Sequence, residues 1–269
     1  MSLWLLWIKR SRQFAAKNDG AWNAAVRFRV TRMDDLVEMP EGWETALAVV
    51  AHPDDLEYGA SGAIARWTAQ GKKITYLLAT RGEAGIDSMA PEEAGPVRER
   101  EQIASAAVVG VDVVEFLDHH DGMITYGLPL RRDIAAAIRR HKPDVVISGN
   151  HHPTFPGGFL NMADHRVVGE ATIDAVRDAA NRWVFRDLEL EPWGGVQHVA
   201  VFGSPQATHA VDITDTLDRA VESLRAHAVY LAGLSGDMAD GPEFLRRIAA
   251  MTGERFGGRA AAAFELLAM

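Results

Sequence analysis

The chain has 269 residues, of which 48% are hydrophobic and 24% charged, and its formal net charge is −9 at pH 7. A chain of this length and composition can bury a full core, so one α/β domain is the favoured organisation. An acidic chain without a basic, aromatic-rich stripe is not expected to bind nucleic acid. Because it contains no cysteine, a metal could be held only by histidine and carboxylate side chains.

Residues 1–32 differ in composition from the rest of the chain. They carry seven Lys or Arg residues, one acidic residue and three tryptophans, whereas the remainder carries 21 basic and 36 acidic residues. We therefore predict an N-terminal extension at residues 1–32, outside the core, and a single domain at residues 33–269 with its natural start near Met33. The alternative, that the extension forms a helix packed on the domain, stays open.

No apolar stretch approaches the roughly 20 residues needed to span a bilayer. The N-terminus places an apolar patch before its cations, which is the reverse of the order in a signal peptide. These two features predict a cytoplasmic protein that does not act at a membrane.

Short apolar runs alternate with helical patterns along the chain, as in repeated β-α units. This alternation predicts an α/β fold with a mostly parallel sheet covered by helices on both faces. We expect the final helices to pack against the sheet edge or to join a second copy in a homo-oligomer, and helix propensity alone explains the alanines at 260–263. The predicted strands are residues 46–51, 74–80, 113–117, 145–148 and 198–202. The predicted helices are residues 60–70, 97–109, 130–140, 164–180, 215–231 and 243–269.

Polar side chains that suit metal binding follow these strands, at the edge where ligands bind in parallel sheets. His52 and Asp55 are three residues apart on a turn that Pro53 stiffens, so both can point at one spot. Zinc in hydrolases usually takes three protein ligands from histidine and carboxylate, with a fourth position left open. His165, at the start of the helix after the fourth strand, is the best candidate for the third ligand.

The neighbouring carboxylates have further roles in this interpretation. Asp164 would orient an imidazole from outside the metal ligands, and Asp54 would take the proton of a water whose pKa the zinc lowers toward about 7. An Asp-Asp pair can instead cap a helix that begins near Gly59. A nucleotide site is a weaker alternative, because the acidic turn would repel a pyrophosphate and the G-x-G-x-x-G pattern is missing.

Together these motifs resemble the PIG-L/LmbE-like zinc-dependent de-N-acetylases. The resemblance runs from about residue 46 to residue 169. It is carried by AHPDD at 51–55, TRGEAG at 80–85, R-x-x-E at 98–101, KPD at 142–144 and Asp164-His165.

The resemblance implies a Rossmann-like domain that removes an acetyl group from an N-acetylated amino-sugar conjugate or a related amide. It implies one Zn²⁺ ion held by three side chains, one general base, and two side chains that bind sugar hydroxyls. The zinc ligands would be His52, Asp55 and His165. Asp54 would be the general base, and Arg98 and Asp121 would bind the sugar hydroxyls.

One departure from the family pattern concerns the stretch before His165. Many relatives have a histidine where this chain has Met162, and that histidine stabilises the oxyanion or protonates the leaving amine. His151, His152 and His209 are available substitutes. Two alternative functions stay open: an amidase for a non-sugar or thiol-conjugate amide with the same metal centre, and a sugar-binding relative without catalysis.

Arg98 and Glu101 also have a simpler interpretation. They are three residues apart on a predicted helix, where a surface ion pair would be worth a few tenths of a kcal/mol.

We predict that a chain starting at Met33 folds like the full-length chain, because the core-forming patterns begin after the change in charge. Circular dichroism and urea unfolding of the two chains test this. A shortened chain that is unfolded, or that unfolds at clearly lower urea, would show that the extension belongs to the folded domain.

Overall fold

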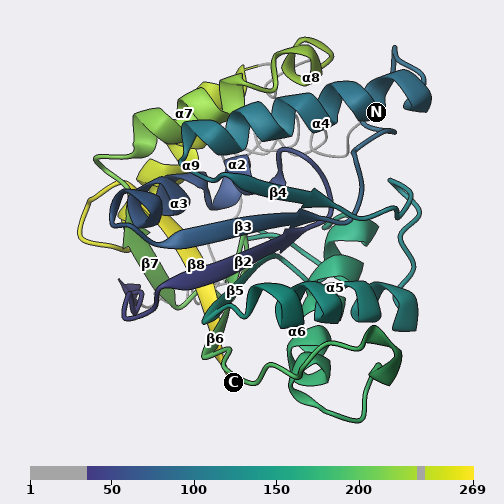
Figure 1. The fold of residues 1–269 in the computed structure, drawn as a ribbon. Helices are drawn as coiled ribbons and strands as arrows, with labels where there is room; N and C mark the ends of the chain where they lie inside the picture. The colour runs from purple at the N-terminus through teal and green to yellow at the C-terminus, as the bar shows by residue number, and fades with distance from the viewer. Residues whose placement is uncertain (1–34, 235–239) are drawn as a thin grey trace, which may run out of the picture.

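A computed structural model describes residues 35–234 and 240–269, and these residues form an eight-stranded sheet with helices on both faces (Figure 1). The strands are β1 (Val37–Glu38), β2 (Thr45–Val50), β3 (Lys73–Leu78), β4 (Val113–Phe116), β5 (Val145–Gly149), β6 (His198–Phe202), β7 (His209–Asp212) and β8 (Ala261–Ala268). Their order is β1-β7-β8-β6-β5-β2-β3-β4, and β8 alone runs antiparallel to its neighbours. The predicted extension at residues 1–32 lies outside the described residues and stays a prediction.

The central strands are nearly continuous apolar runs, which is what a parallel sheet covered on both faces requires. The interior of β2, from Ala46 to Val50, is buried throughout. Alternate residues of β2, β3, β5 and β6 supply two cores, one on each face of the sheet. The largest fully buried side chains are those of Trp67, Tyr76 and Phe264.

Helices α5 (Leu128–His141) and α6 (Ala163–Ala180) cover one face of the sheet and pack closely against each other. The other face carries α3 (Ser61–Ala69), α4 (Pro91–Val108), α7 (Leu217–Arg225) and α9 (Gly241–Gly253), as Figure 1 shows. The shorter elements are α2 (Asp55–Gly59), α8 (Ala228–Ala232) and the 3₁₀ helix η1 (Arg186–Leu188). The predicted α/β fold is confirmed, and among the described residues no helix is long and apolar enough to cross a membrane.

The prediction of a helix over residues 243–269 is wrong in its second half. Helix α9 ends at Gly253, and Ala261–Ala268 form strand β8, which fills the place between β6 and β7. Alanine prefers helix by less than about 1 kcal/mol over most residues. Hydrogen bonding to two neighbouring strands and the burial of Phe264 outweigh this preference.

Further elements differ from the sequence prediction, and they include strands β1 and β7, which were not predicted. The single helix predicted over residues 215–231 is divided into α7 and α8 around His227, whose side chain is fully buried. Helix α2, which follows the first predicted strand directly, was not predicted because it is only five residues long.

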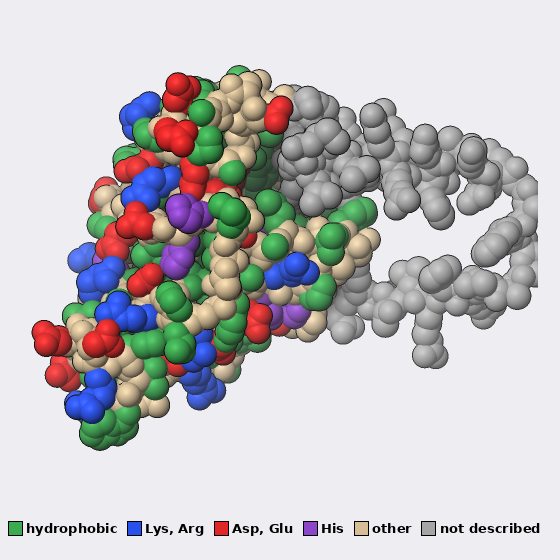
Figure 2. Space-filling view, turned by 90° about the vertical axis from the view of Figure 1, so that its right-hand side faces the viewer, with side chains coloured by type: hydrophobic (Ala, Val, Ile, Leu, Met, Phe, Trp, Pro, Cys, Tyr) green, Lys and Arg blue, Asp and Glu red, His purple; other side chains and the backbone are tan. Residues whose placement is uncertain are grey.

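Strands β2, β3 and β4 end on the right-hand side of Figure 1, and Figure 2 views the molecule from that side. Histidine side chains lie on this face among acidic and basic ones. The loops that follow β2, β3, β4 and β5 are therefore brought to one edge of the sheet.

Gly59, at the end of α2, packs directly against the last residue of β6. A Cβ atom at position 59 would lie 2.1 Å from Cδ2 of Phe202, a side chain that is itself buried. We predict that Gly59→Ala lowers the free energy of unfolding by about 1–3 kcal/mol, because a well-packed core must shift to admit it. Urea unfolding measures this, with Gly42→Ala as control because a Cβ there meets no atom within 4 Å. Equal effects of the two variants would contradict the prediction.

Candidate metal centre

The turn after β2 is held together by the carboxylate of Asp55. Its Oδ2 atom accepts hydrogen bonds from the backbone N–H groups of Ala51, at 3.1 Å, and His52, at 2.9 Å. The donors precede Asp55 in the chain, and Asp54 makes no side-chain cap at the start of α2. The helix-capping alternative for the Asp-Asp pair is therefore wrong, and Asp55 Oδ1 faces away from the turn toward another element.

That element is the first turn of α6, which carries His165. His165 Nε2 lies 3.0 Å from Asp55 Oδ1, yet this buried nitrogen has no partner aligned for a hydrogen bond. His52 Nδ1 lies 3.7 Å from Asp55 Oδ2, and one potential ligand atom from each of the three residues falls within 4.8 Å of the others. Two imidazole nitrogens and a carboxylate oxygen at this spacing form the donor set that zinc takes in hydrolases, so the residues fit the ion.

The far side of the His52 ring is held by two carboxylates. His52 Nε2 lies 3.0 Å from Asp121 Oδ1 and 3.2 Å from Asp164 Oδ2. Asp164 is itself fixed by the backbone N–H groups of Gly122 and Ile124. Since carboxylates accept hydrogen bonds, these partners assign the proton to Nε2 and leave Nδ1 to face Asp55 and a metal.

The same contacts shift the pKa values of His52 and Asp55. Burial alone would lower the pKa of His52, but the carboxylates of Asp121, Asp164 and Asp55 raise it well above its usual value. Burial alone would raise the pKa of Asp55, but His165 and His52 hold it far below its usual range. Without an ion, a proton on His52 offsets part of this buried charge, so metal binding is expected to release a proton.

Asp54 has an unusual backbone conformation, with φ at +81°. This left-handed region is costly for a residue with a side chain and persists only when the surroundings impose it. Here the side-chain oxygen Oε1 of Gln102, from α4, accepts the Asp54 N–H at 2.9 Å. Burial raises the pKa of the Asp54 carboxyl, while the charge of Arg98 opposes this rise.

Arg98 lies directly behind the same turn, and its side chain is 3% exposed. Its Nη2 atom donates to the carbonyl of Pro53 at 2.6 Å and lies 3.3 Å from Asp54 Oδ2. Its guanidinium also stacks 4.0 Å from the ring centroid of Tyr230. The interpretation of Arg98 and Glu101 as a surface pair is wrong: both are buried, and Glu101 accepts the backbone N–H group of Val229.

A buried polar network extends behind Asp54 and was missed from the sequence. Its members are Glu57, Gln102, Ser105, Ser223 and His227, and each is at most 1% exposed. Glu57 Oε1 accepts from Gln102 Nε2 at 3.0 Å and from Ser105 Oγ at 2.7 Å. Burial would raise the pKa of Glu57, but His227, whose Nε2 lies 3.6 Å from Oε2, lowers it.

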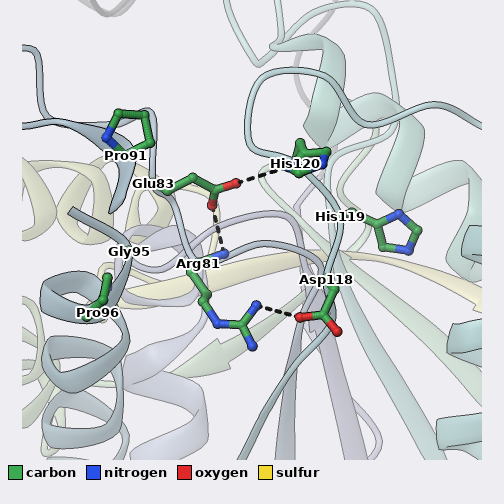
Figure 3. Close-up of a pocket in the computed structure, with 8 residues that line it drawn as sticks. All are labelled: Arg81, Glu83, Pro91, Gly95, Pro96, Asp118, His119 and His120. Atoms are coloured by element: carbon green, nitrogen blue, oxygen red, sulfur yellow. Dashed lines mark hydrogen bonds and ion pairs between the residues drawn. The ribbon is translucent and has the colours of Figure 1, made fainter. Parts of the chain in front are cut away.

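A pocket of about 270 Å³ lies beyond the ends of β3 and β4 and is lined by Arg81, Glu83 and His120 among others. Figure 3 shows the carboxylate of Glu83 between the backbone nitrogen of Arg81 and the ring of His120, with the Arg81 guanidinium turned to Asp118. Glu83 Oε1 also accepts the backbone N–H of Asp121, the residue that contacts His52. The pocket and the candidate ligands are thus joined through one short segment.

The histidines suggested as substitutes at position 162 lie in different places. His151 and His152 follow β5, and their ring centroids are 4.1 Å apart. His209 opens β7, which β8 and β6 separate from β5, and its ring contacts Thr208. Met162 is the residue before α6, and its backbone N–H is bonded to Asn161 Oδ1.

Comparison with known proteins gives consistent matches. The PIG-L family model, described as GlcNAc-PI de-N-acetylase, matches residues 47–176. Diacetylchitobiose deacetylase of Thermococcus kodakarensis is 30% identical over 189 residues, which cover 67% of this chain and 68% of that protein. The 1D-myo-inositol 2-acetamido-2-deoxy-alpha-D-glucopyranoside deacetylase of Acidothermus cellulolyticus is 30% identical over 247 residues, covering 74% and 81%. The solved structure of N,N'-diacetylchitobiose deacetylase from Pyrococcus horikoshii matches with a TM-score of 0.77 at 26% identity, over 85% of each chain.

We predict that Gln102→Met lowers the free energy of unfolding by about 1–3 kcal/mol, because the buried N–H of Asp54 and the Glu57 carboxylate each lose a partner. Chemical denaturation measures the loss. Gln70→Met is the matched control, since Gln70 bonds to Glu41 at the surface. The prediction fails if the Gln102 variant is as stable as its control.

Proposed function

We propose, since this chain belongs to the PIG-L family of de-N-acetylases, that it hydrolyses the acetamide bond of an N-acetylglucosamine conjugate with the aid of zinc. The observation that carries the proposal is the convergence of His52, Asp55 and His165 beside the buried carboxylate of Asp54. The products would be acetate and the free amine of the sugar.

The relatives support an amino-sugar substrate. One is a deacetylase of diacetylchitobiose, and another acts on an acetamido-glucopyranoside of inositol. The two conjugates differ in what is attached to the amino sugar. We therefore assign the acetamide group to the metal centre and the attached part of the conjugate to the pocket lined by Arg81, Glu83 and His120.

Zinc bound by His52, Asp55 and His165 would supply a Lewis acid for the acetyl carbonyl and lower the pKa of water. Asp54 would accept the proton of the attacking water, a role that its raised pKa favours near neutral pH. The same carboxyl would then return a proton to the leaving amine. Arg98, 3.3 Å away, would keep Asp54 in place and limit its protonation before the reaction.

The outer residues of the centre would hold its geometry. Asp121 and Asp164 fix the orientation of the His52 ring through Nε2. Asp121 and Arg98 are also our proposed contacts to sugar hydroxyls, as the resemblance implies. Arg98 would contact the sugar while it keeps its hydrogen bonds to the carbonyls of Pro53 and Gly82.

We predict that Asp54→Ala retains bound zinc but lowers kcat for acetate release by about 10²- to 10⁴-fold, because a general base is lost while the three candidate ligands stay. Elemental analysis and an acetate assay on N-acetylglucosamine conjugates measure the two quantities. Asp187→Asn, an exposed partner of Arg132, serves as the control. Full turnover by Asp54→Ala would rule out the proposed base.

The same assay separates the alternatives. Acetate release from thiol-conjugate or non-sugar amides, and none from amino sugars, would favour the amidase. Binding of N-acetylglucosamine conjugates without acetate release at saturating zinc would favour a binding protein, in line with Met162 replacing the family histidine. A cytoplasmic location and association into a homo-oligomer also stay predictions.

A further inference from the structure

A second group of metal-binding side chains lies outside the centre described above. It consists of His151 and His152, which follow β5, and Glu265 in β8, and we call it the histidine–glutamate cluster. One potential ligand atom from each residue lies within 4.8 Å of the others. None of the three contributes to the set formed by His52, Asp55 and His165.

The contacts within the cluster leave one ligand atom without a partner. His152 Nε2 lies 2.7 Å from Glu265 Oε2, which also accepts a hydrogen bond from Ser204 Oγ. The His151 ring packs against that of His152 at an interplanar angle of 36°, and His151 Nδ1 is buried without a hydrogen-bond partner. Hydrogen bonding therefore accounts for His152 and Glu265 but not for the position of His151.

The position of His151 is nevertheless fixed by close packing. A Cβ atom at Gly169 of α6 would lie 2.8 Å from Cβ of His151 and 2.8 Å from the carbonyl oxygen of Gly149. The helix approaches the histidine this closely only because residue 169 has no side chain. The ring is thus held against its neighbour, with its free nitrogen shielded from water.

The cluster repeats the composition of the first centre. Each set has two imidazoles and one carboxylate. Within each set, a nitrogen of one histidine lies within about 3 Å of a carboxylate oxygen, and the ring of the other histidine lies beside this pair. A divalent ion would replace the short nitrogen–oxygen contact with two metal–ligand bonds. Zinc accepts such a set, and Ser204 would orient the carboxylate from outside it.

The segment between β5 and α6 carries ligands of both sets, and Asn161 links them. Its Nδ2 atom donates to the carbonyls of Asn150, at 2.6 Å, and His152, at 3.0 Å. Its Oδ1 atom lies 3.2 Å from His165 Nδ1. An ion in the cluster would therefore tie this segment to β8 and steady the side chain that orients His165.

We propose that His151, His152 and Glu265 form a second divalent-cation site, suited to zinc, that fastens the segment between β5 and α6 to strand β8. This site goes beyond the proposed hydrolysis and does not depend on it.

The test is the number of zinc ions bound by the full chain after chelator treatment and equilibrium dialysis against Zn²⁺. We expect two ions per chain for the wild type, one for Glu265→Gln, one for Asp55→Ala, and none for the double variant. Glu115→Gln is the matched control, because Glu115 lies 2.7 Å from His141 Nε2, as Glu265 does from His152, but belongs to no group of three potential ligands within residues 35–234 and 240–269. It should bind two ions.

His151→Ala gives a second measurement, because removal of a ring without a hydrogen bond at Nδ1 should leave the fold intact while the count falls to one. Zinc counts in both Glu265→Gln and His151→Ala that equal the wild-type count would overturn the proposal, whereas a single wild-type ion that Glu265→Gln removes would place the failure in the first centre. Failure of the proposed hydrolysis is distinguishable, since absent acetate release would leave the count of two unchanged.

Discussion

The carboxylate of Asp55 joins two parts of the molecule that are 110 residues apart in sequence. One oxygen closes the turn after β2 through two backbone N–H groups, and the other meets His165 at the start of α6. Burying this charge would be costly without such partners. The turn after β2 and the first turn of α6 are therefore connected through this single side chain.

The region behind the turn explains how Asp54 is kept in a conformation that the backbone disfavours. Gln102 can satisfy the Asp54 N–H only with its oxygen, because its NH₂ group is directed at the Glu57 carboxylate. The amide orientation is thus fixed by the chemistry of its two partners. Gln102 of α4 stabilises the disfavoured conformation of Asp54, with φ at +81°, by accepting its N–H group. The carboxyl of Asp54 remains beside Arg98, which also lies on α4.

The parallel part of the sheet and the convergence of the candidate metal ligands were predictable because both depend on local patterns. Apolar runs such as residues 46–51 are long enough to identify buried strands, and the polar residues after them must meet at one edge. The network around Glu57 was not predictable, since its partners come from α4, α7 and the residue before α8. A polar stripe on α4, with Arg98, Gln102 and Ser105 at helical spacing, was the one available signal.

The C-terminal strand was mispredicted because alanine carries little information about its surroundings. Residues 261–268 are buried by their neighbours in the sheet rather than by their own apolar pattern. Local propensity is outweighed wherever tertiary hydrogen bonding decides the conformation. The burial of Arg98 could not be predicted for a similar reason. Its helix was predicted from local sequence, but its burial behind the turn depends on loops distant in sequence.

The place of β8 also has a consequence for how the protein is made. Strands β6 and β7 are neighbours in the chain but not in the sheet, because β8 separates them. A ribosome releases both strands before the residues that must be inserted between them. Until β8 is synthesised, the edges of β6 and β7 that it covers lack their partner, and unpaired strand edges of this kind favour aggregation.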